Sequence, residues 1–440
     1  MNHRAVSINK DILSLAVPSV ISNVVVPLLG MVDIAIAGRI GDDLNIAALA
    51  IGVTIFNFIY WNCAFLRMGT SGITAQAYGA DNRKESANML LRALWIAVVI
   101  ALLLLIFQKP VGQFSLKVMQ GSEKVQALAA DYFFARIWAV PAAIMLFAIQ
   151  GWFIGMQDAK IPMIVSIAAV ICNALFSLLF VFRFNMGIAG IAWGTVTAQY
   201  LALILSGIFW LVKYRNYRTY FDLKEAFKLE PIVRFMNVNK DIFLRTVCIV
   251  AVYTFFTAAS ARFGDEILAT NALLMQLFTL FSYMSDGFAY AGEALSGRLV
   301  GERNRLALKQ YIRYLLLWSV VIAVVYVVGY LCAWKEILLL FNPSHEVLDI
   351  AGQYIVWIIA VPLAGCIPFM IDGIMIGATK TKILRDTVFV STCLFFACFY
   401  LFSRSFGNTA LWFAFLVFLV VRGILLYFCS HRLNVDKIMK

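Results

Sequence analysis

The sequence predicts an all-α polytopic membrane protein with twelve transmembrane helices, arranged as two pseudo-symmetric six-helix bundles around a central cleft. Three observations lead to this fold class: an apolar composition, twelve long apolar runs and an internal repeat. Of the 440 residues, 62% are hydrophobic and only 14% are charged, with a mean hydropathy of +0.86. A soluble chain usually has roughly 25% charged residues. We therefore expect lipid to cover much of the surface.

Twelve runs reach the length of about 20 mainly apolar residues that a membrane-spanning helix needs. Glycines and prolines within several of these runs are tolerated in membrane helices and predict kinks. The expected spans are 12–38, 46–78, 89–108, 127–155, 161–183, 187–212, 241–263, 267–298, 312–334, 346–378, 383–404 and 408–430.

The two halves of the chain match at a nearly constant offset, which indicates an internal repeat. The pair Gly151 and Gly155, for example, recurs as Gly373 and Gly377. Each half contains six spans, so both halves cross the membrane in the same direction. They are therefore parallel repeats about an axis along the membrane normal, an arrangement typical of transporters that open to alternate sides.

The longest polar stretch, residues 213–240, separates the spans six and six. We expect an N-terminal bundle over 1–212, a cytoplasmic linker over 213–240 and a C-terminal bundle over 241–440. The basic residues of the linker could contact anionic lipid, although a solvated connector is the simpler interpretation. Most lysines and arginines lie in this linker and in the loops on its side, which predicts that both termini are cytoplasmic.

The net charge of +12 does not indicate a nucleic-acid partner, because the basic residues lie in short loops between apolar runs. The eight cysteines form no CxxC pair, so neither a disulfide framework nor a zinc site is predicted. The sequence has no Walker motif, GxSxG or HExxH, so we expect neither ATP hydrolysis nor hydrolase activity. No cofactor or bound metal is expected.

Several motifs together resemble the multidrug and toxic compound extrusion (MATE) family, and within it the DinF-like branch. They are Pro18 followed by Asp33, the segments 65–80 and 286–301, and the QG-xxx-G motif that begins at Gln150. The resemblance covers essentially the whole chain. It implies a secondary exporter driven by a proton or sodium gradient, located in the bacterial cytoplasmic (inner) membrane.

Asp33 is the carboxylate that we expect to carry the coupling. An ionisable group inside a membrane helix is costly and is a functional candidate by default. It lies five residues before Gly38, about 7 Å from the outer end of its helix. The structural alternative is an ion pair within the same bundle, with Arg67 or Arg136 as the partner.

Three further polar residues are expected at similar depth in the same bundle. Asn173, Ser177 and Thr195 lie about 15, 9 and 12 Å from the outer ends of their helices. The resemblance implies that Asp33, Asn173 and Thr195 correspond to a first-half cation site. Ser177 stands where the family often has Asp, which weakens the case for tightly bound sodium. Proton coupling is therefore the leading hypothesis, and a weak Na⁺ site at Asp33, Asn173 and Thr195 is the alternative.

Two prolines suggest how protonation of Asp33 would move the chain. Loss of the carboxylate charge would release its hydrogen bonds, and the first helix could then bend at Pro18 or Pro27. Both prolines are therefore candidate hinge residues.

A second set of polar residues is a tentative substrate cleft or gate. Asp286 and Glu293 are seven residues apart and share a helix face. Glu293 could contact a cationic substrate, or it could pair with Arg67 or Arg298 and close the inner side. The complete set is Arg67, Gln76, Asp286, Glu293 and Arg298.

Three hypotheses of function follow, and the leading one is a proton-coupled antiporter for amphipathic or cationic small molecules. A flippase of lipid-linked precursors from the same superfamily is the second, although its members usually have a strongly cationic cavity. A membrane-embedded enzyme is the third, and no catalytic constellation supports it. The expected partners are the lipid bilayer and a small-molecule substrate, and we expect a monomer.

Overall fold

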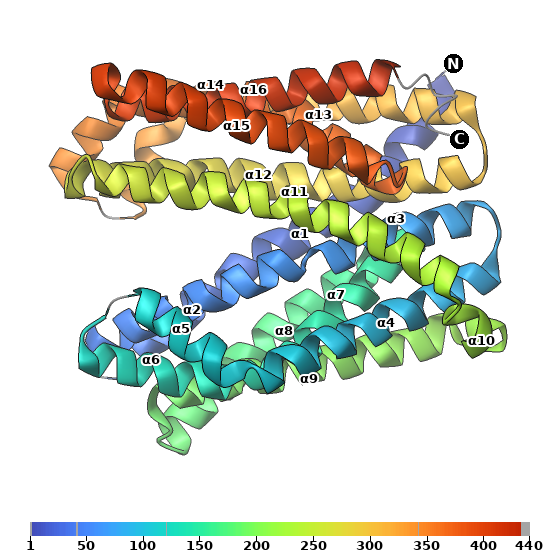
Figure 1. Cartoon of the computed structure of the whole chain (residues 1–440), viewed down its shortest axis with the longest axis horizontal. Helices are drawn as coiled ribbons and strands as arrows, with labels where there is room; N and C mark the ends of the chain where they lie inside the picture. Colours follow the sequence, from blue (N-terminus) through green and yellow to red (C-terminus); the bar gives the residue numbers. More distant parts are fainter. Residues whose placement is uncertain (1, 41–42, 120, 342, 433–440) are drawn as a thin grey trace. The chain divides into compact units, whose positions relative to one another are not determined.

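The structure is a computed structural model that describes residues 2–40, 43–119, 121–341 and 343–432. Within these ranges all regular elements are helical (Figure 1). The first half contains α1 (Asn2–Ala37), α2 (Asp43–Cys63), α3 (Phe65–Gly79), α4 (Arg83–Ile106), α5 (Gln108–Met119), α6 (Glu123–Arg136), α7 (Val140–Gly155), α8 (Lys160–Leu178) and α9 (Gly187–Lys213). The second half contains α10 (Leu223–Ala226), α11 (Leu229–Ala261), α12 (Asp265–Gly301), α13 (Arg305–Leu339), α14 (His345–Gly377), α15 (Thr381–Phe406) and α16 (Asn408–Arg432).

The described part of the chain contains 12 segments that are long and apolar enough to cross a membrane, which confirms the predicted number of spans. Two of these spans are each built from two successive α-helices, α2 with α3 and α6 with α7. The short helix α5 was not expected, because its 12 residues are too few to span a membrane and include polar side chains along its length. Large apolar side chains on the outside, such as Val325 and Leu401, are 60% and 73% exposed. Lipid would cover these side chains.

The glycines of the internal repeat lie where two helices cross at very short range. A Cβ atom on Gly151 of α7 would lie 2.3 Å from the carbonyl oxygen of Arg67 on α3. A Cβ atom on Gly373 of α14 would lie 2.2 Å from the carbonyl oxygen of Ala289 on α12. The same offset in the sequence relates the two glycines and the two residues that they contact. The α3–α7 crossing therefore recurs as the α12–α14 crossing.

The same relation holds one helical turn further on. A Cβ atom on Gly155 would lie 2.7 Å from the carbonyl oxygen of Ser71, and one on Gly377 would lie 2.1 Å from that of Glu293. Small residues let membrane helices approach closely, and a side chain at any of these positions would force the helices apart. The repeat that the sequence shows is therefore a repeat of backbone packing.

The chain divides into two compact units, residues 21–236 and residues 1–20 with 237–440. The first part of α1 thus packs with the second half of the chain. Its contacts there are specific, because Tyr311 donates a hydrogen bond to Asp11 at 2.5 Å and Trp318 donates one to Asn9 at 3.1 Å. The first residues of α11, up to Met236, belong in turn to the other unit.

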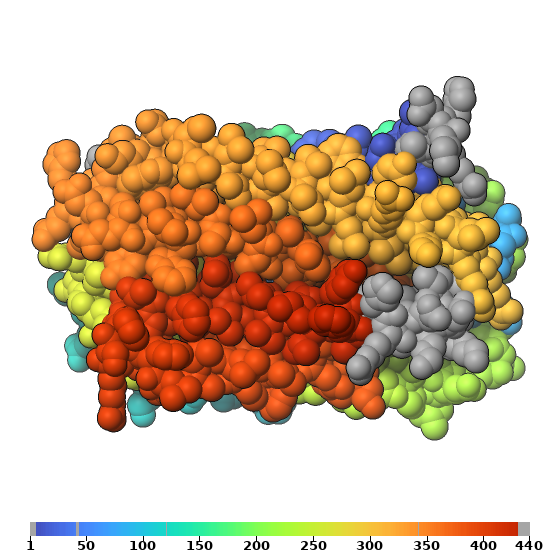
Figure 2. Space-filling model, turned by 90° about the horizontal axis from the view of Figure 1, so that it is seen from above, coloured from blue at the N-terminus to red at the C-terminus, as the bar shows by residue number. Residues whose placement is uncertain are grey.

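Within the second unit, α12 packs along α14, and α15 packs along α16. Figure 2 shows α13 and α14 (orange) beside α15 and α16 (red) on one face of this unit. In the first unit the corresponding pairs are α3 with α7 and α8 with α9. These helix pairs position the polar residues described below.

The linker between the two halves is largely exposed, but hydrogen bonds hold it against α4. Asn88 accepts a hydrogen bond from the backbone N–H of Asp222 at 3.0 Å, and Arg92 Nε donates to the carbonyl of Ala226 at 2.7 Å. Lys84 Nζ lies 2.9 Å from the Asp222 carboxylate. The expectation of a simple solvated connector is thus incomplete. From Leu229 onward the predicted linker is already part of α11.

Candidate functional site

Asp33 lies four residues before the end of α1 and is fully buried. Neither of its carboxyl oxygens has a hydrogen-bond partner in the described part of the chain. Its polar neighbours are Arg136, which acts on it electrostatically, and Asn173, whose side chain is the hydrogen-bonding group beside it. A buried carboxyl group whose oxygens lack donors is costly for a purely structural residue.

Asn173 of α8 and Thr195 of α9 are brought together by the packing of these two helices. Asn173 Nδ2 donates to Thr195 Oγ1 at 2.9 Å, and the threonine hydroxyl donates to the carbonyl of Ile191 at 3.2 Å. Asn173 Oδ1 is buried and has no hydrogen-bond partner among the described residues. The site thus offers oxygen acceptors from both Asp33 and Asn173.

Ser177 lies one turn beyond Asn173 and is also fully buried, but it has a different role in the packing. Its hydroxyl donates to the carbonyl of Ile191 at 3.4 Å. Gly194 of α9 packs directly against it, since a Cβ atom there would lie 2.2 Å from Ser177 Oγ. Ser177 therefore sets the close approach of α8 and α9, and its hydroxyl is bonded to backbone.

Arg136, at the end of α6, is the cation that accompanies this site. It is buried, donates a hydrogen bond to the hydroxyl of Tyr132, and lies 5.0 Å from the ring centroid of Phe56. Of the two arginines expected as partners of Asp33, Arg136 lies close enough to act on the carboxylate. The signal in the sequence was a single basic residue inside an apolar span.

This arrangement can hold a proton or a small cation. An ionised Asp33 is balanced by the nearby guanidinium of Arg136, while a protonated Asp33 could donate to the free oxygen of Asn173. Arg136 retains the Tyr132 hydroxyl and the aromatic faces in either state. Both charge states of the carboxyl group are thus compatible with the surrounding residues.

The second half of the chain has aromatic residues at the positions equivalent to this polar site. Phe255 of α11 contacts Phe395 and Phe399 of α15, with ring centroids 5.9 and 5.1 Å apart. By the repeat offset, these three phenylalanines correspond in order to Asp33, Asn173 and Ser177. The duplication preserved the helix packing, but at these described positions of the second half phenylalanines replace the polar side chains.

The tentative cleft residues are distributed over α3 and α12. Arg67 and Glu293 are buried, whereas Gln76 and Asp286 are partly exposed. Asp286 accepts a hydrogen bond from a serine one turn away at 3.4 Å. Arg298 lies 3.8 Å from the carboxylate of Asp11 in α1 and 3.4 Å from that of Glu302. Arg298 is therefore paired with carboxylates near the end of its own helix and at the start of α1.

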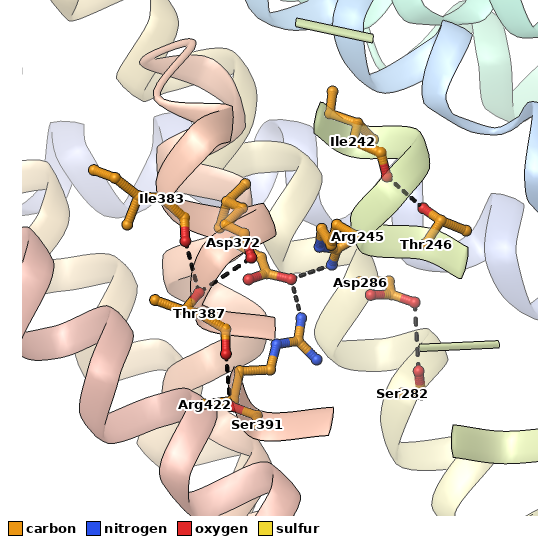
Figure 3. Close-up of polar contacts among 11 residues, drawn as sticks. Ile242, Arg245, Thr246, Ser282, Asp286, Asp372, Ile383, Thr387, Ser391 and Arg422 are labelled. Atoms are coloured by element: carbon orange, nitrogen blue, oxygen red, sulfur yellow. Dashed lines mark hydrogen bonds and ion pairs between the residues drawn. The ribbon is translucent and has the colours of Figure 1, made fainter. Parts of the chain in front are cut away.

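A buried charge cluster in the second unit was not predicted from the sequence. Arg245 of α11 and Arg422 of α16 both donate to Oδ2 of Asp372 on α14 (Figure 3). Each of the three side chains is at most 11% exposed. The available signal was that all three charges lie inside or at the edge of apolar runs. Their contact depends on the rotation of three helices, which composition does not determine.

Comparison with known proteins agrees with these observations. A sequence model of the MatE family matches residues 18–179 and 242–401, one segment in each half. DNA damage-inducible protein F of Escherichia coli (strain K12) is 34% identical over 420 residues, which cover 95% of this chain and 91% of that protein. A solved structure of MATE in the bent conformation aligns with a TM-score of 0.87 at 18% identity, covering 98% of this chain and 96% of that one. MATE in the straight conformation gives a TM-score of 0.86 at 19% identity, with 98% and 97% covered.

The twelve spans of the described residues, together with the family match over both halves, define a multi-pass membrane transporter rather than an enzyme. The chain belongs to the MatE family of multidrug and toxic compound efflux transporters.

Proposed function

We propose that this transporter is an antiporter that exports amphipathic or cationic small molecules in exchange for protons by alternating access. The observation that carries the proposal is Asp33, a fully buried carboxyl group whose oxygens make no hydrogen bond of normal geometry among the described residues. An intramembrane ionisable residue of this kind is typical of a proton relay. The neighbouring Arg136 and Asn173 supply partners for its two protonation states.

The link between protonation and movement is α1 itself. Pro27 removes the backbone donor that would bond to the carbonyl of Asn23, and Pro18 does the same at Ser14. Between these prolines, after Val20, the helix passes from one compact unit to the other. A change in the contacts of Asp33 would thus act on a helix that is weakened at two points. MATE structures have been solved in bent and straight conformations, which supports this hinge as part of the proposal.

The experiment is proton-linked flux of a cationic dye from proteoliposomes that contain Asp33→Asn. The amide keeps the size of the side chain but cannot release a proton. We expect gradient-driven export to fall to the level of empty liposomes, with an unchanged unfolding temperature. The matched control is Asp131→Asn, which changes an exposed carboxylate of α6 in the same unit and should leave flux unchanged. Full export by Asp33→Asn would disprove the proposal.

Sodium coupling is the second candidate, favoured by one observation. The free Oδ1 of Asn173 and the carboxyl oxygens of Asp33 are the kind of ligands that hard cations prefer. Dye export is therefore measured with a proton gradient in sodium-free choline buffer. Proton coupling predicts undiminished export under these conditions, whereas export that requires added sodium would establish the alternative.

The proposed setting is the bacterial cytoplasmic membrane, with both termini cytoplasmic. The excess of basic residues in the linker and in the loops on its side supports this orientation. We also propose that the chain works as a monomer surrounded by lipid and needs no cofactor other than the ion gradient. Cysteine labelling from either side of the membrane at Arg262→Cys, in the loop before α12, tests the topology. Labelling of this cysteine from the cytoplasmic side would show the opposite orientation and contradict the proposal.

A further inference from the structure

The cluster of Arg245, Asp372 and Arg422 has more hydrogen-bond donors than acceptors. Each guanidinium carries five N–H donors, and the hydrogen bonds to Asp372 use only one nitrogen of each arginine. Nε of Arg245, Nε of Arg422 and Oδ1 of Asp372 are buried and have no hydrogen-bond partner in the described part of the chain. Such donors destabilise the fold unless an acceptor reaches them.

The surroundings of the cluster combine charge with aromatic surface. Tyr253 of α11 is partly exposed and lies within electrostatic reach of Arg245, Arg422, Asp372 and Asp286. Its ring contacts two phenylalanines, with centroids 5.7 and 6.0 Å away. These two residues are Phe278 and Phe415. A patch with guanidinium groups beside aromatic rings suits an amphiphile that carries an anionic head.

The cluster has no counterpart in the first half of the chain. By the repeat offset, the equivalent positions are occupied by Asn23, Gln150 and Tyr200. The charges are therefore not needed to build the repeated fold. Arg245 also lies ten residues before Phe255, the position equivalent to Asp33, which is about 15 Å along α11. The cluster is thus separate from the proposed coupling site in sequence and in unit.

We propose that Arg245 and Arg422 form a subsite for the anionic oxygen group, a carboxylate or a phosphate, of an amphiphilic cargo. Guanidinium groups bind such planar or tetrahedral oxygen groups through paired hydrogen bonds. In the absence of cargo, Asp372 orients both arginines. When cargo binds, its oxygens accept from the free Nε–H groups, and its apolar part packs on the rings beside Tyr253. This proposal rests on the export function proposed above and adds amphiphiles with an anionic group, zwitterions included, to the substrates of the transporter.

The test is the binding of a dansyl-labelled long-chain carboxylate, compared with its uncharged primary amide, to the purified full chain in neutral detergent. The variant is the double substitution R422Q/D372N, which removes one charge of each sign and leaves a neutral side-chain pair able to hydrogen-bond. We expect the wild type to prefer the carboxylate, and the variant to lose at least about tenfold in carboxylate affinity, because a charge-assisted hydrogen bond is lost. Affinity for the amide should not change.

The matched control is R385Q/D241N, which removes a second ion pair of the same unit. Arg385 Nη1 lies 2.7 Å from Asp241 Oδ1, outside the cluster. This control should keep the preference for the carboxylate. Arg245→Lys gives an independent variant that retains the charge but loses the forked geometry, and it should weaken carboxylate binding by a smaller factor. A carboxylate preference that survives in R422Q/D372N, or its absence in the wild type, would overturn the proposal.

Two further experiments are needed. The first distinguishes cargo from a lipid headgroup as the source of the anion, and the second distinguishes failure of this proposal from failure of the proposed export function. Gradient-driven export of the bound carboxylate from proteoliposomes would support the assignment of the subsite to cargo. If short-chain phosphatidylglycerol competes for the site and the carboxylate is not exported, the subsite binds a lipid headgroup and the cargo assignment is overturned. Asp33→Asn should bind the carboxylate normally but not export it. R422Q/D372N should keep an unfolding temperature close to that of the wild type, and a large drop in that temperature together with the loss of carboxylate binding would indicate a purely structural cluster and overturn the proposal.

Discussion

Two buried polar side chains in this chain have opposite hydrogen-bonding environments. Asn271 donates to Ser260 and Asn408, both at 2.7 Å, and accepts from Trp412 at 2.9 Å, so its amide is satisfied. Asp33 is equally inaccessible, but neither oxygen makes a hydrogen bond of normal geometry among the described residues. The first pattern is that of a structural residue. The second pattern is the one expected if Asp33 exchanges a proton or a cation, as proposed above.

The sequence alone was sufficient to place Asp33, Asn173 and Thr195 at comparable depth, because depth depends only on the residue count from a helix end. It did not identify which arginine accompanies Asp33, nor the convergence of Arg245 and Arg422 on one carboxylate. These contacts depend on how each helix is rotated about its axis. Rotation is set by packing, and in an apolar span every face offers similar side chains.

Gly194 gives a prediction for the coupling site at the scale of one residue. A Cβ atom at this position would lie 2.6 Å from the backbone nitrogen of Ser177, so Gly194→Ala must push α8 and α9 apart. We expect a loss of about 1–3 kcal/mol in stability, as for other overpacked positions, together with reduced export. Thermal unfolding in detergent measures the first effect. Gly207→Ala on the same helix, where nothing lies within 4 Å, is the control and should unfold at the wild-type temperature or above.

At the scale of helices, the predicted spans were largely correct because length and apolarity define a membrane helix. Three details were not predictable from apolarity. The helix α5 is too short to register as a span, the break after Cys63 between α2 and α3 lies inside an apolar run, and α11 begins within the polar linker. Each depends on backbone hydrogen bonding or tertiary contacts.

The repeated helix crossings give a second prediction. Gly151→Ala and Gly373→Ala each place a methyl group against a backbone carbonyl of the crossing helix, which cannot move away as a side chain would. We expect each variant to lose about 1–3 kcal/mol of stability. Gly329→Ala on α13, where no atom lies within 4 Å, should be neutral or slightly stabilising. Equal unfolding temperatures for all three variants would contradict the crossing geometry.

The docking of the linker gives a prediction that depends on pH. The hydrogen bond from Lys84 holds the pKa of Asp222 below its usual value. A depressed pKa means that the carboxylate stabilises the docked linker at neutral pH, and that this contribution is lost as the pH falls through the lowered pKa. Protease cleavage of the linker should therefore stay slow down to acidic pH in the wild type. In Asp222→Asn, cleavage should be faster at neutral pH and nearly independent of pH; wild-type protection in this variant would contradict the role of the ion pair.

At the scale of the whole molecule, one architecture carries two different chemistries. The same crossing glycines build both halves, yet the polar cluster of the first half is replaced by phenylalanines in the second. The second half instead carries the arginine pair, where the first has neutral residues. The repeat was evident in the sequence, and so was the absence of a second Asp33. The new cluster became visible only when the helices were assembled.

The exchange of helix ends between the units predicts how a severed chain behaves. A cut between Phe227 and Lys228, in the exposed linker, leaves residues 1–20 on one fragment and their packing partners on the other. We expect the two fragments to purify as a complex when they are expressed together. The fragment 1–227 alone should be degraded or aggregate, because its first segment exposes the face that contacts α13. A stable, monodisperse 1–227 fragment would contradict this.

The position of the first part of α1 also bears on how such a chain arose. A six-helix ancestor with the packing of one half would have lacked a partner for the start of its own first helix. Two identical copies could each have supplied that segment to the other, as in a domain-swapped dimer with twofold symmetry. Fusion of the two genes would have made the exchange permanent within one chain. It would also have released each half from identity with the other, so that equivalent positions could diverge, as they have at Asp33 and Phe255.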